Sequence, residues 1–278
     1  MITIKKPHEI EALGEGGARL AYILGELAKV VKEGAGRSAK EIDELAEKLA
    51  VDGGDKPAFL GYKPEGAREP YPASVCISIN DEVVHGIPTA DKIFKTGDVV
   101  AIDMGLIHKE LITDSAVTVI VGGSKDGGEV KERKGDALDR AANVAAKKLV
   151  SATKKALDLG IKAARAGATV GDIGFAIEQF VRPLGFGLAE GLAGHGVGYE
   201  IHEDPYVPNT GKAGEGPVLK PGMVIAIEPM LTEGSGRVIF EKDGYTVRTR
   251  DGKRSAHFEH TIVITEKGPK VLTQKQTR

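Results

Sequence analysis

Two stretches of the chain carry the same pattern: KTGDVVAIDMG at residues 95–105 and KPGMVIAIEPM at residues 220–230. Each places a lysine two positions before a glycine, continues with an apolar run, and closes that run with an acid. The acid is Asp103 in the first copy and Glu228 in the second, 125 residues further along. Short apolar runs of this kind are typical of buried strands. The repetition therefore predicts two related strands, in each of which the apolar run is closed by a carboxylate.

A second pair of similar segments lies upstream of these strands. SAKEIDELAEKLA at 38–50 and TVGDIGFAIEQFV at 169–181 both open with Ser or Thr followed three residues later by an acid, which predicts a capped helix start. Because both pairs occur in the same order, we interpret the chain as one domain of two related halves, approximately 1–123 and 137–278. The polar run 124–136 between them is typical of a linker or loop. Chance similarity of short strands is the alternative.

In each half, helices precede strands. Apolar residues at steps of three and four predict a helix over 8–33, and the segment 137–165 is its expected counterpart. Strands are predicted at 73–80, 98–106, 111–121, 223–231, 237–240, 245–250 and 256–265. Helices followed by antiparallel strands indicate an α+β fold rather than alternating β-α-β units.

Composition narrows the class of protein. With 38 basic and 40 acidic residues the net charge is −2, which argues against a nucleic-acid binder. No apolar run is long enough to span a membrane, and the N-terminal residues lack the apolar core of a signal peptide. The single cysteine, Cys76, cannot form an intrachain disulfide. We therefore expect a protein of the reducing cytoplasm.

The predicted hairpin over 98–121 brings two carboxylates together. A turn centred at His108 and Lys109 would place Asp103 directly opposite Asp114, with Cβ atoms roughly 4.5–5.5 Å apart. Two carboxylates in an apolar setting repel each other and are costly to bury, so a shared proton or a cation must compensate.

The second half supplies further candidate ligands: Glu228 in AIEPM, Glu259 in SAHFEHTIVIT, and His195 between glycines in LAGHGVG. Four acids and one imidazole suit Mn, Fe, Co or Zn and do not suit a structural zinc site, which needs thiolates. Five ligands exceed what one catalytic zinc takes, whereas two ions roughly 3.5–4 Å apart would use them all. Taken singly, each acid could be a solvated strand end, His195 a core or loop histidine, and His85 a turn residue.

Several segments together resemble the bacterial type I methionine aminopeptidases. They are VCISINDEVVHGIP (75–88), AIDMG (101–105), TDSAVTV (113–119), GHGVGYEIHEDP (194–205), KPGMVIAIEPM (220–230) and DGYTVRTRDGKRSAHFEHTIVIT (243–265). The match covers nearly the whole chain in the right order. It implies the pita-bread fold, an α+β architecture of two pseudo-symmetric halves around a centre of two divalent metal ions, whether Co, Mn, Fe, Zn or Ni.

The resemblance also implies roles for individual residues. The metal ligands would be Asp103, Asp114, His195, Glu228 and Glu259, of which Asp114 and Glu259 would bridge the ions. His85 would assist proton transfer, His202 would bind the substrate carbonyl, and Glu228 would be the general base for attack by metal-activated water. The methionine pocket would be lined by Tyr71, Cys76, Ile201 and Tyr245.

The implied activity is removal of the initiator methionine from peptides and nascent chains, with small second residues favoured. A monomer and ribosome association are further expectations. The chain departs from the family pattern at Val84, Tyr245, His257, Arg68 and Glu69, which leaves pocket shape and metal preference open. A gating role of the glycine-rich loop 208–217 is also open.

Two other functions compete with this hypothesis. An Xaa-Pro aminopeptidase or prolidase shares the DMG and TDSAVT segments, although such enzymes usually carry a long additional N-terminal domain. A non-catalytic pita-bread binding module is the second alternative, but such modules typically lose ligands, and here all four acids and the imidazole are present.

Overall fold

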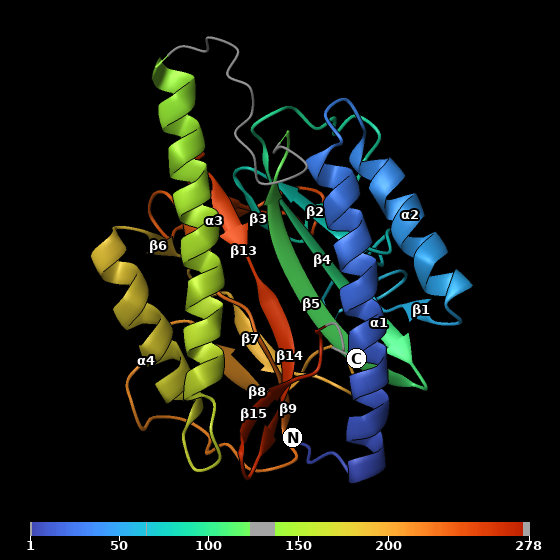
Figure 1. Cartoon of the computed structure of the whole chain (residues 1–278), viewed down its shortest axis with the longest axis vertical. Coiled ribbons are helices and arrows are strands. Elements are labelled where there is room, and N and C mark those ends of the chain that lie inside the picture. Colours follow the sequence, from blue (N-terminus) through green and yellow to red (C-terminus); the bar gives the residue numbers. More distant parts are fainter. Residues whose placement is uncertain (1, 65, 123–136, 275–278) are drawn as a thin grey trace.

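Helices cover one side of a long curved sheet in the computed structural model, which describes residues 2–64, 66–122 and 137–274 (Figure 1). The helices are α1 (Pro7–Lys32), α2 (Ala39–Asp52), α3 (Ala137–Ala163), α4 (Val170–Val181) and the 3₁₀ turn η1 (Arg182–Leu184). The strands are β1 (Lys56–Pro57), β2 (Cys76–Ile79), β3 (Glu82–Val84), β4 (Val99–His108), β5 (Leu111–Ile120), β6 (Gly187–Leu188), β7 (Ala193–Gly196), β8 (Glu203–Pro208), β9 (Val224–Ile227), β10 (Met230–Thr232), β11 (Val238–Phe240), β12 (Val247–Thr249), β13 (Ser255–His257), β14 (Glu259–Thr265) and β15 (Gly268–Val271).

The main sheet runs through both halves of the chain. Its strand order is β1-β4-β5-β14-β9-β7-β8, with β2 also pairing with β4 and β15 with β14, and all these pairs are antiparallel. The repeated strands β4 and β9 thus occupy corresponding places on either side of the central pair β5 and β14. The α+β class expected from the sequence is confirmed.

Each pair of helices covers its own apolar core. Figure 1 shows α1 and α2 on one side of the central strands and α3 and α4 on the other. One core joins α1 and α2 to β2, β4 and β5, and includes Leu20, Ile42 and Ile102. The other joins α3 and α4 to β9 and β14, and includes Ile177 and Ile225. This separation into two cores fits a duplicated architecture.

Period-two alternation in the strands separates the helix-covered face from the opposite face. In β4, Val100, Ile102 and Met104 belong to the core under α1 and α2. The residues between them therefore point the other way, and among them is Asp103. In β5 the same alternation directs Asp114 to that inner face.

Capping boxes begin the two equivalent helices α2 and α4, as the sequence predicts. The Ser38 hydroxyl accepts a hydrogen bond from the peptide N–H of Glu41, and the Thr169 hydroxyl accepts one from that of Asp172. In each box the peptide N–H of the capping residue donates a hydrogen bond to the carboxylate of the acid, at 2.7 Å. Both helix starts therefore have satisfied peptide donors.

The predicted register of the β4–β5 hairpin is wrong by two residues. His108 pairs with Leu111, so the turn is formed by Lys109 and Glu110, both at positive φ. Asp103 consequently faces Ala116, and Gly105 faces Asp114. The two acids are diagonal neighbours on one face rather than directly opposite.

Two long predicted strands are each divided in two. The segment 223–231 breaks into β9 and β10 around Glu228 and Pro229, since proline has no N–H to offer a ladder. The segment 256–265 breaks into β13 and β14 at Phe258. The short strands β1, β3, β6, β7, β8 and β15 were not predicted, and the expected linker 124–136 lies outside the described residues.

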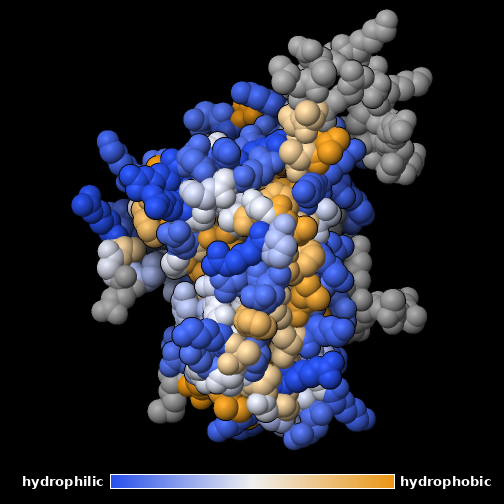
Figure 2. Space-filling view, turned by 90° about the vertical axis from the view of Figure 1, so that its left-hand side faces the viewer, coloured by the Kyte–Doolittle hydropathy of each residue, from blue (hydrophilic) through white to orange (hydrophobic). Residues whose placement is uncertain are grey.

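The side of the molecule that carries α4 has a mixed surface. Figure 2 shows a vertical band of hydrophobic side chains there, among many hydrophilic ones. Among the described side chains of the two helices of this half, the exposed large apolar ones are Val144 on α3 and Phe175 on α4. Among the described residues, no helix combines the length and apolar character needed to cross a membrane.

Removing either helix cap is expected to destabilise the fold to a similar extent. Ser38→Ala and Thr169→Ala should each lower the free energy of unfolding by about 1 kcal/mol, because each leaves helix N–H groups without an acceptor. Urea unfolding followed by circular dichroism measures this. Ser151→Ala, on the exposed surface of α3, is the control and should change stability by less than about 0.5 kcal/mol. Equal behaviour of all three variants would contradict the capping account.

Candidate metal centre

Five candidate metal ligands lie on, or directly after, five adjacent strands of the main sheet. Following the strand order, they are Asp103 on β4, Asp114 on β5, Glu259 at the start of β14, Glu228 at the end of β9, and His195 on β7. The first half of the chain contributes the first two of these side chains and the second half the other three. The halves meet where β5 pairs with β14 through Glu259 and Ala116, a junction that we call the seam. Curvature of the sheet brings the five together.

Side-chain hydroxyls join the two halves at this seam. Thr261 donates to the carbonyl of Asp114 at 2.7 Å and accepts from its N–H at 2.9 Å. Ser115 donates to the carbonyl of Glu259 at 2.7 Å. The backbones of Asp114 and Glu259 are thereby fixed against the opposite strand, although regular pairing between β5 and β14 covers only two residue pairs.

Close strand contact explains the glycines beside His195. A Cβ at Gly194 would lie 2.2 Å from the carbonyl oxygen of Ala226, and one at Gly196 would lie 2.1 Å from that of Asp204. The groups that approach these two glycines most closely are therefore backbone carbonyls of neighbouring strands. The glycines let β7 lie close to β9 and β8, and this places the imidazole over the site.

His195 is held in one tautomer. Its Nδ1 lies 2.9 Å from the carbonyl oxygen of Gly196, which can only accept, so Nδ1 carries the proton. The other nitrogen, Nε2, keeps its lone pair and lies 3.5 Å from Glu228 Oε1 and 3.9 Å from Asp114 Oδ2. A backbone carbonyl that fixes the tautomer in this way is typical of metal-binding histidines.

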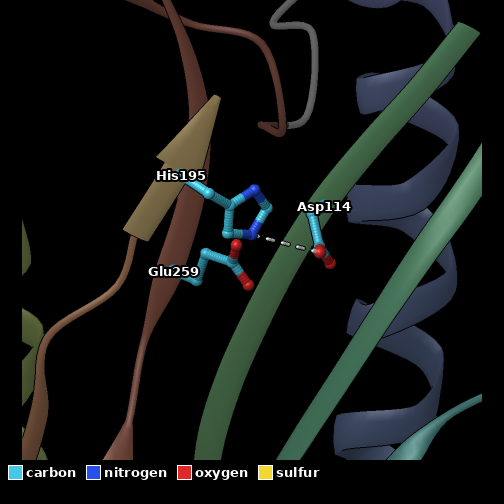
Figure 3. Close-up of side chains that lie close together, drawn as sticks. All are labelled: Asp114, His195 and Glu259. Carbon is cyan, nitrogen blue, oxygen red and sulfur yellow. Dashed lines mark ion pairs between the residues drawn. The ribbon is translucent and has the colours of Figure 1, made fainter. Parts of the chain in front are cut away.

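Three of the five side chains form a compact group. One ligand atom from each of Asp114, His195 and Glu259 lies within 4.8 Å of the others, and Figure 3 shows them converging from separate strands. Asp103 and Glu228 lie next to this group. In addition to burial, the charge of Asp114 raises the pKa of Asp103, and the charge of Glu228 raises the pKa of Asp114.

The acid side chains have unmet polar atoms. Within the described residues, one buried carboxylate oxygen each of Asp103, Asp114 and Glu259 has no hydrogen-bond partner. Natural proteins rarely leave such atoms unsatisfied without a role for them. Carboxylate oxygens plus one imidazole lone pair fit a divalent cation of the Mn, Fe, Co or Zn kind.

Burial and crowding make the carboxyl groups hard to ionise without a cation. Burial raises the pKa of Glu228 to about 8, and burial followed by the charge of Glu228 raises that of Asp114 to about 8. The pKa values of Asp103 and Glu259 rise well above their usual range, first through burial and then through neighbouring acids. Burial lowers the pKa of His195 to about 3, so this imidazole is neutral and able to bind a metal.

An apolar cavity adjoins the five side chains. It has a volume of about 860 Å³ and includes Asp103, Asp114, His195, Glu228 and Glu259 in its lining. Tyr71, Cys76 and Tyr245 line one wall of this cavity, and Ile201 belongs to the same apolar cluster but is not among the lining residues. Because Cys76 pairs with Asp103 between β2 and β4, this wall lies directly beside the carboxylates. The four predicted pocket residues thus lie together.

The same cluster contains aromatic residues that the sequence analysis missed. Phe59 and Tyr62 line the cavity, and the Phe59 ring meets that of Tyr71 edge-on at 6.4 Å. They come from the irregular segment between β1 and β2, where no period signals their position. A Cβ at Gly105 would lie 2.9 Å from the Phe59 ring and 3.1 Å from Ile201, so this glycine makes room for the pocket wall.

Two further predicted histidines face the cavity. The ring of His202 lies 4.5 Å from that of His195, and its Nδ1 lies 3.1 Å from the Tyr62 hydroxyl. His85 lies in the lining with positive φ of 57°, and its carbonyl is 3.5 Å from the Thr246 hydroxyl. Positive φ in a non-glycine residue is uncommon and clusters at functional sites.

The positions that depart from the family pattern have different surroundings. Val84 is buried and lines the cavity, and the Tyr245 hydroxyl donates to the carbonyl of Glu69 at 2.5 Å. His257 is buried beside Glu228, with its Nε2 3.4 Å from Oε2.

The glycine-rich loop 208–217 packs on α4, where the N–H of Gly211 donates to the carboxylate of Glu178. This loop borders a separate cavity of about 610 Å³.

Comparison with known proteins gives one consistent family. The model of metallopeptidase family M24 matches residues 11–266. A methionine aminopeptidase of Aquifex aeolicus is 44% identical over 98% of this chain and 99% of that protein. The crystal structure of a methionine aminopeptidase from Thermotoga maritima superposes with a TM-score of 0.85 at 42% identity, covering 99% of this chain and 100% of that one.

The solved structure of an enzyme with a different name, a prolidase, shares the fold at lower sequence identity. The prolidase from Pyrococcus furiosus has a TM-score of 0.72 at 24% identity, and the match covers 99% of this chain but 66% of that one. This likeness concerns the fold alone.

The raised carboxyl pKa values predict how the stability of metal-free protein depends on pH. Between about pH 4.5 and 8 the folded chain holds protons on Asp114 and Glu228 that the unfolded chain has released, so stability falls as pH rises. Buried His195 gives the opposite slope, but only below its unfolded pKa of about 6.5. Unfolding free energy should therefore drop between pH 6.5 and 8, by roughly 1–2 kcal/mol per protonated carboxyl.

Urea titrations of chelator-treated protein at several pH values test this. Glu228→Gln should show a smaller drop, because the amide has no proton to release. Metal-saturated protein should show stability that rises with pH, since metal ligands must be deprotonated. A metal-free stability that is flat from pH 6.5 to 8 in both wild type and variant would contradict the account.

Proposed function

The chain belongs to metallopeptidase family M24, and from this premise we propose that it is a methionine aminopeptidase, a hydrolase that removes the N-terminal methionine from peptides and nascent proteins. Methionine aminopeptidases at 36–44% identity match nearly the full chain. The observation that carries the proposal is the junction of five side chains of metal-ligand type with an apolar wall of the adjoining cavity. The five side chains would hold the metal ions needed for peptide hydrolysis. The pocket beside them would select methionine as the terminal residue.

The metal centre holds two divalent ions through Asp103, Asp114, His195, Glu228 and Glu259. The number of donors supports two ions rather than one: four carboxylates and an imidazole exceed the ligand set of a single catalytic zinc. When bound, such ions supply a water nucleophile at neutral pH, because they lower its pKa toward about 7. The same donors accept Co, Mn, Fe, Zn or Ni, so the side chains leave the identity of the metal open.

Glu228 is the general base. Its carboxyl is 12% exposed and lies at the cavity wall, and a positioned carboxylate is one of the groups that serve as general bases. It would take a proton from the attacking water and return it to the leaving amine. The backbone at Glu228 is fixed, since Asn209 donates to its carbonyl at 3.0 Å.

His202 binds the carbonyl of the scissile peptide. When the Tyr62 hydroxyl donates to Nδ1 of His202, the ring carries its proton on Nε2 and can donate it to a substrate oxygen. Such a donor stabilises the negative charge that develops on that oxygen in the transition state. His85, also in the cavity lining, assists proton transfer near the scissile bond.

The wall of Tyr71, Cys76, Ile201 and Tyr245, completed by Phe59, binds the methionine side chain. The wall is apolar, and the Tyr71 hydroxyl is turned away to donate to the carbonyl of Gly86 at 3.1 Å. A flexible thioether packs well against aromatic rings. Small second residues are favoured because a large side chain next to the scissile bond must share the same cavity.

The proposed substrate indicates the cellular compartment in which the protein acts. Nascent chains are made in the cytoplasm, and the free, buried thiol of Cys76 suits that reducing compartment. We infer action as a monomer, close to the ribosome.

A proline-specific peptidase is the alternative of the same fold. It is less supported, because the solved prolidase shares 24% identity and the match covers two thirds of its chain. Wild-type protein should cleave Met-Ala-Ser at least about 100-fold faster, in kcat/KM, than Ala-Pro-Ser, since only methionine fills the apolar pocket. Equal or reversed rates, measured by amino-acid release with Mn(II) or Co(II), would favour the alternative.

Asp103→Asn tests the metal role and the binding-module alternative together. Loss of one carboxylate should lower the turnover of Met-Ala-Ser by about 100-fold or more. The metal content, measured by elemental analysis, should fall as well. Asp52→Asn is a matched control, because Asp52 lies exposed at the end of α2 and pairs only with Lys48 among the described contacts. Near-normal turnover and metal content in Asp103→Asn would reject the assignment.

His202→Ala should separate the carbonyl contact from metal binding. We expect kcat to fall by about 10²–10³-fold while metal content is unchanged. Tyr62→Phe should give a smaller fall in kcat, of about 10-fold, because the ring remains but the tautomer of His202 is no longer fixed. If His202→Ala loses metal instead, His202 is a ligand and its proposed role is wrong.

A further inference from the structure

His257 is a buried histidine next to the metal centre that the proposed reaction does not use. It ends β13, opposite Met230 of β10, and its residue is 1% exposed. The sequence alone marked it only as a departure from the family pattern. Its position two residues before Glu259 puts it on the same face of the chain as that acid.

The backbone of His257 is fixed at both its polar groups. Its N–H donates to the hydroxyl of Thr118 at 3.0 Å, and the same hydroxyl donates to its carbonyl at 2.6 Å. Thr118 lies on β5, the strand that carries Asp114. The ring of His257 is therefore built into the seam between the two halves and not left at a flexible loop.

The ring is close to one partner only. Nε2 lies 3.4 Å from Oε2 of Glu228, while within the described residues neither ring nitrogen makes a regular hydrogen bond. Oε1 of the same carboxylate lies 3.5 Å from Nε2 of His195. Glu228 thus stands between two imidazoles, one facing each of its oxygens.

The two imidazoles cannot have the same role. Nε2 of His195 carries a lone pair, because its Nδ1 proton is held by Gly196. Nε2 of His257 faces Oε2 of Glu228, whereas Nε2 of His195 faces Oε1 of that carboxylate and the ligand atoms of Asp114 and Glu259. A neutral imidazole still has one N–H, and the acceptor within reach among the described residues is Oε2 of Glu228.

We propose that His257 is a positioning residue: its Nε2 lies 3.4 Å from Oε2 of Glu228 without a regular hydrogen bond here, and when bound metal keeps this carboxylate ionised, Nε2–H donates to Oε2 and so directs Oε1 toward His195 and the metal. The inference rests on the proposed metal centre and deepens it. A carboxylate ligand that accepts a hydrogen bond from its surroundings is fixed in orientation, and loss of such a partner typically lowers metal affinity 10- to 100-fold.

Two substitutions separate hydrogen bonding from packing. His257→Gln keeps an N–H donor of similar reach, whereas His257→Met keeps similar volume and has no donor. The dissociation constant for Mn(II) or Co(II) is measured by competition with a fluorescent chelator, and the number of ions bound by elemental analysis. Thermal melting of the metal-free variants shows that each is folded.

We expect His257→Met to bind metal 10- to 100-fold more weakly and His257→Gln to stay within about threefold of wild type, with an unchanged number of ions. Wild-type affinity in His257→Met, or equal loss in both variants, overturns the proposal, as does a lower number of ions in His257→Gln, which would make His257 a ligand. If His257→Met does not fold, the Gln variant alone decides by the same limits. Failure of the proposed function is distinct, since wild type would then bind no metal.

Discussion

The repulsion among four crowded carboxylates, three of them buried and Glu228 largely so, is the constraint on which the structure depends. Asp103, Asp114, Glu228 and Glu259 are drawn from strands far apart in sequence into one nearly dry junction. Their raised pKa values express the cost of that junction in the absence of a cation. A fold selected for stability alone would place apolar residues there. The arrangement is explained if divalent metal ions take up the charge, and the site is then a means of holding those ions beside a pocket.

The duplicated architecture solves the problem of bringing such groups together. Each half supplies helices that cover an apolar core and a repeated strand that carries an acid, Asp103 within β4 and Glu228 directly after β9, and the halves meet along β5 and β14. At that seam the hydroxyls of Ser115, Thr118 and Thr261 supplement a short ladder. The residues that hold the halves together are thus neighbours of the candidate metal ligands, so fold and site share one set of contacts.

Local signals in the sequence were enough for most of the fold. Capping boxes at Ser38 and Thr169 and the apolar period of α1 are short-range patterns, and their helices begin within a residue or two of the predicted positions. The hairpin register was missed because Lys109 and Glu110 both adopt positive φ, which neither residue type signals. The broken strands reflect Pro229 and the crossing of the seam, which are tertiary effects. Tyr62 and Phe59 reach the pocket from irregular chain, where no period exists to be read.

The central claim is that paired divalent ions relieve the crowding of these five side chains. Anomalous diffraction from crystals grown with Mn(II) or Co(II) tests it most directly. The account predicts two anomalous peaks roughly 3.5–4 Å apart, enclosed by Asp103, Asp114, His195, Glu228 and Glu259. Well-diffracting crystals in which the five side chains are ordered but the peaks are absent, or lie elsewhere on the protein, would contradict it.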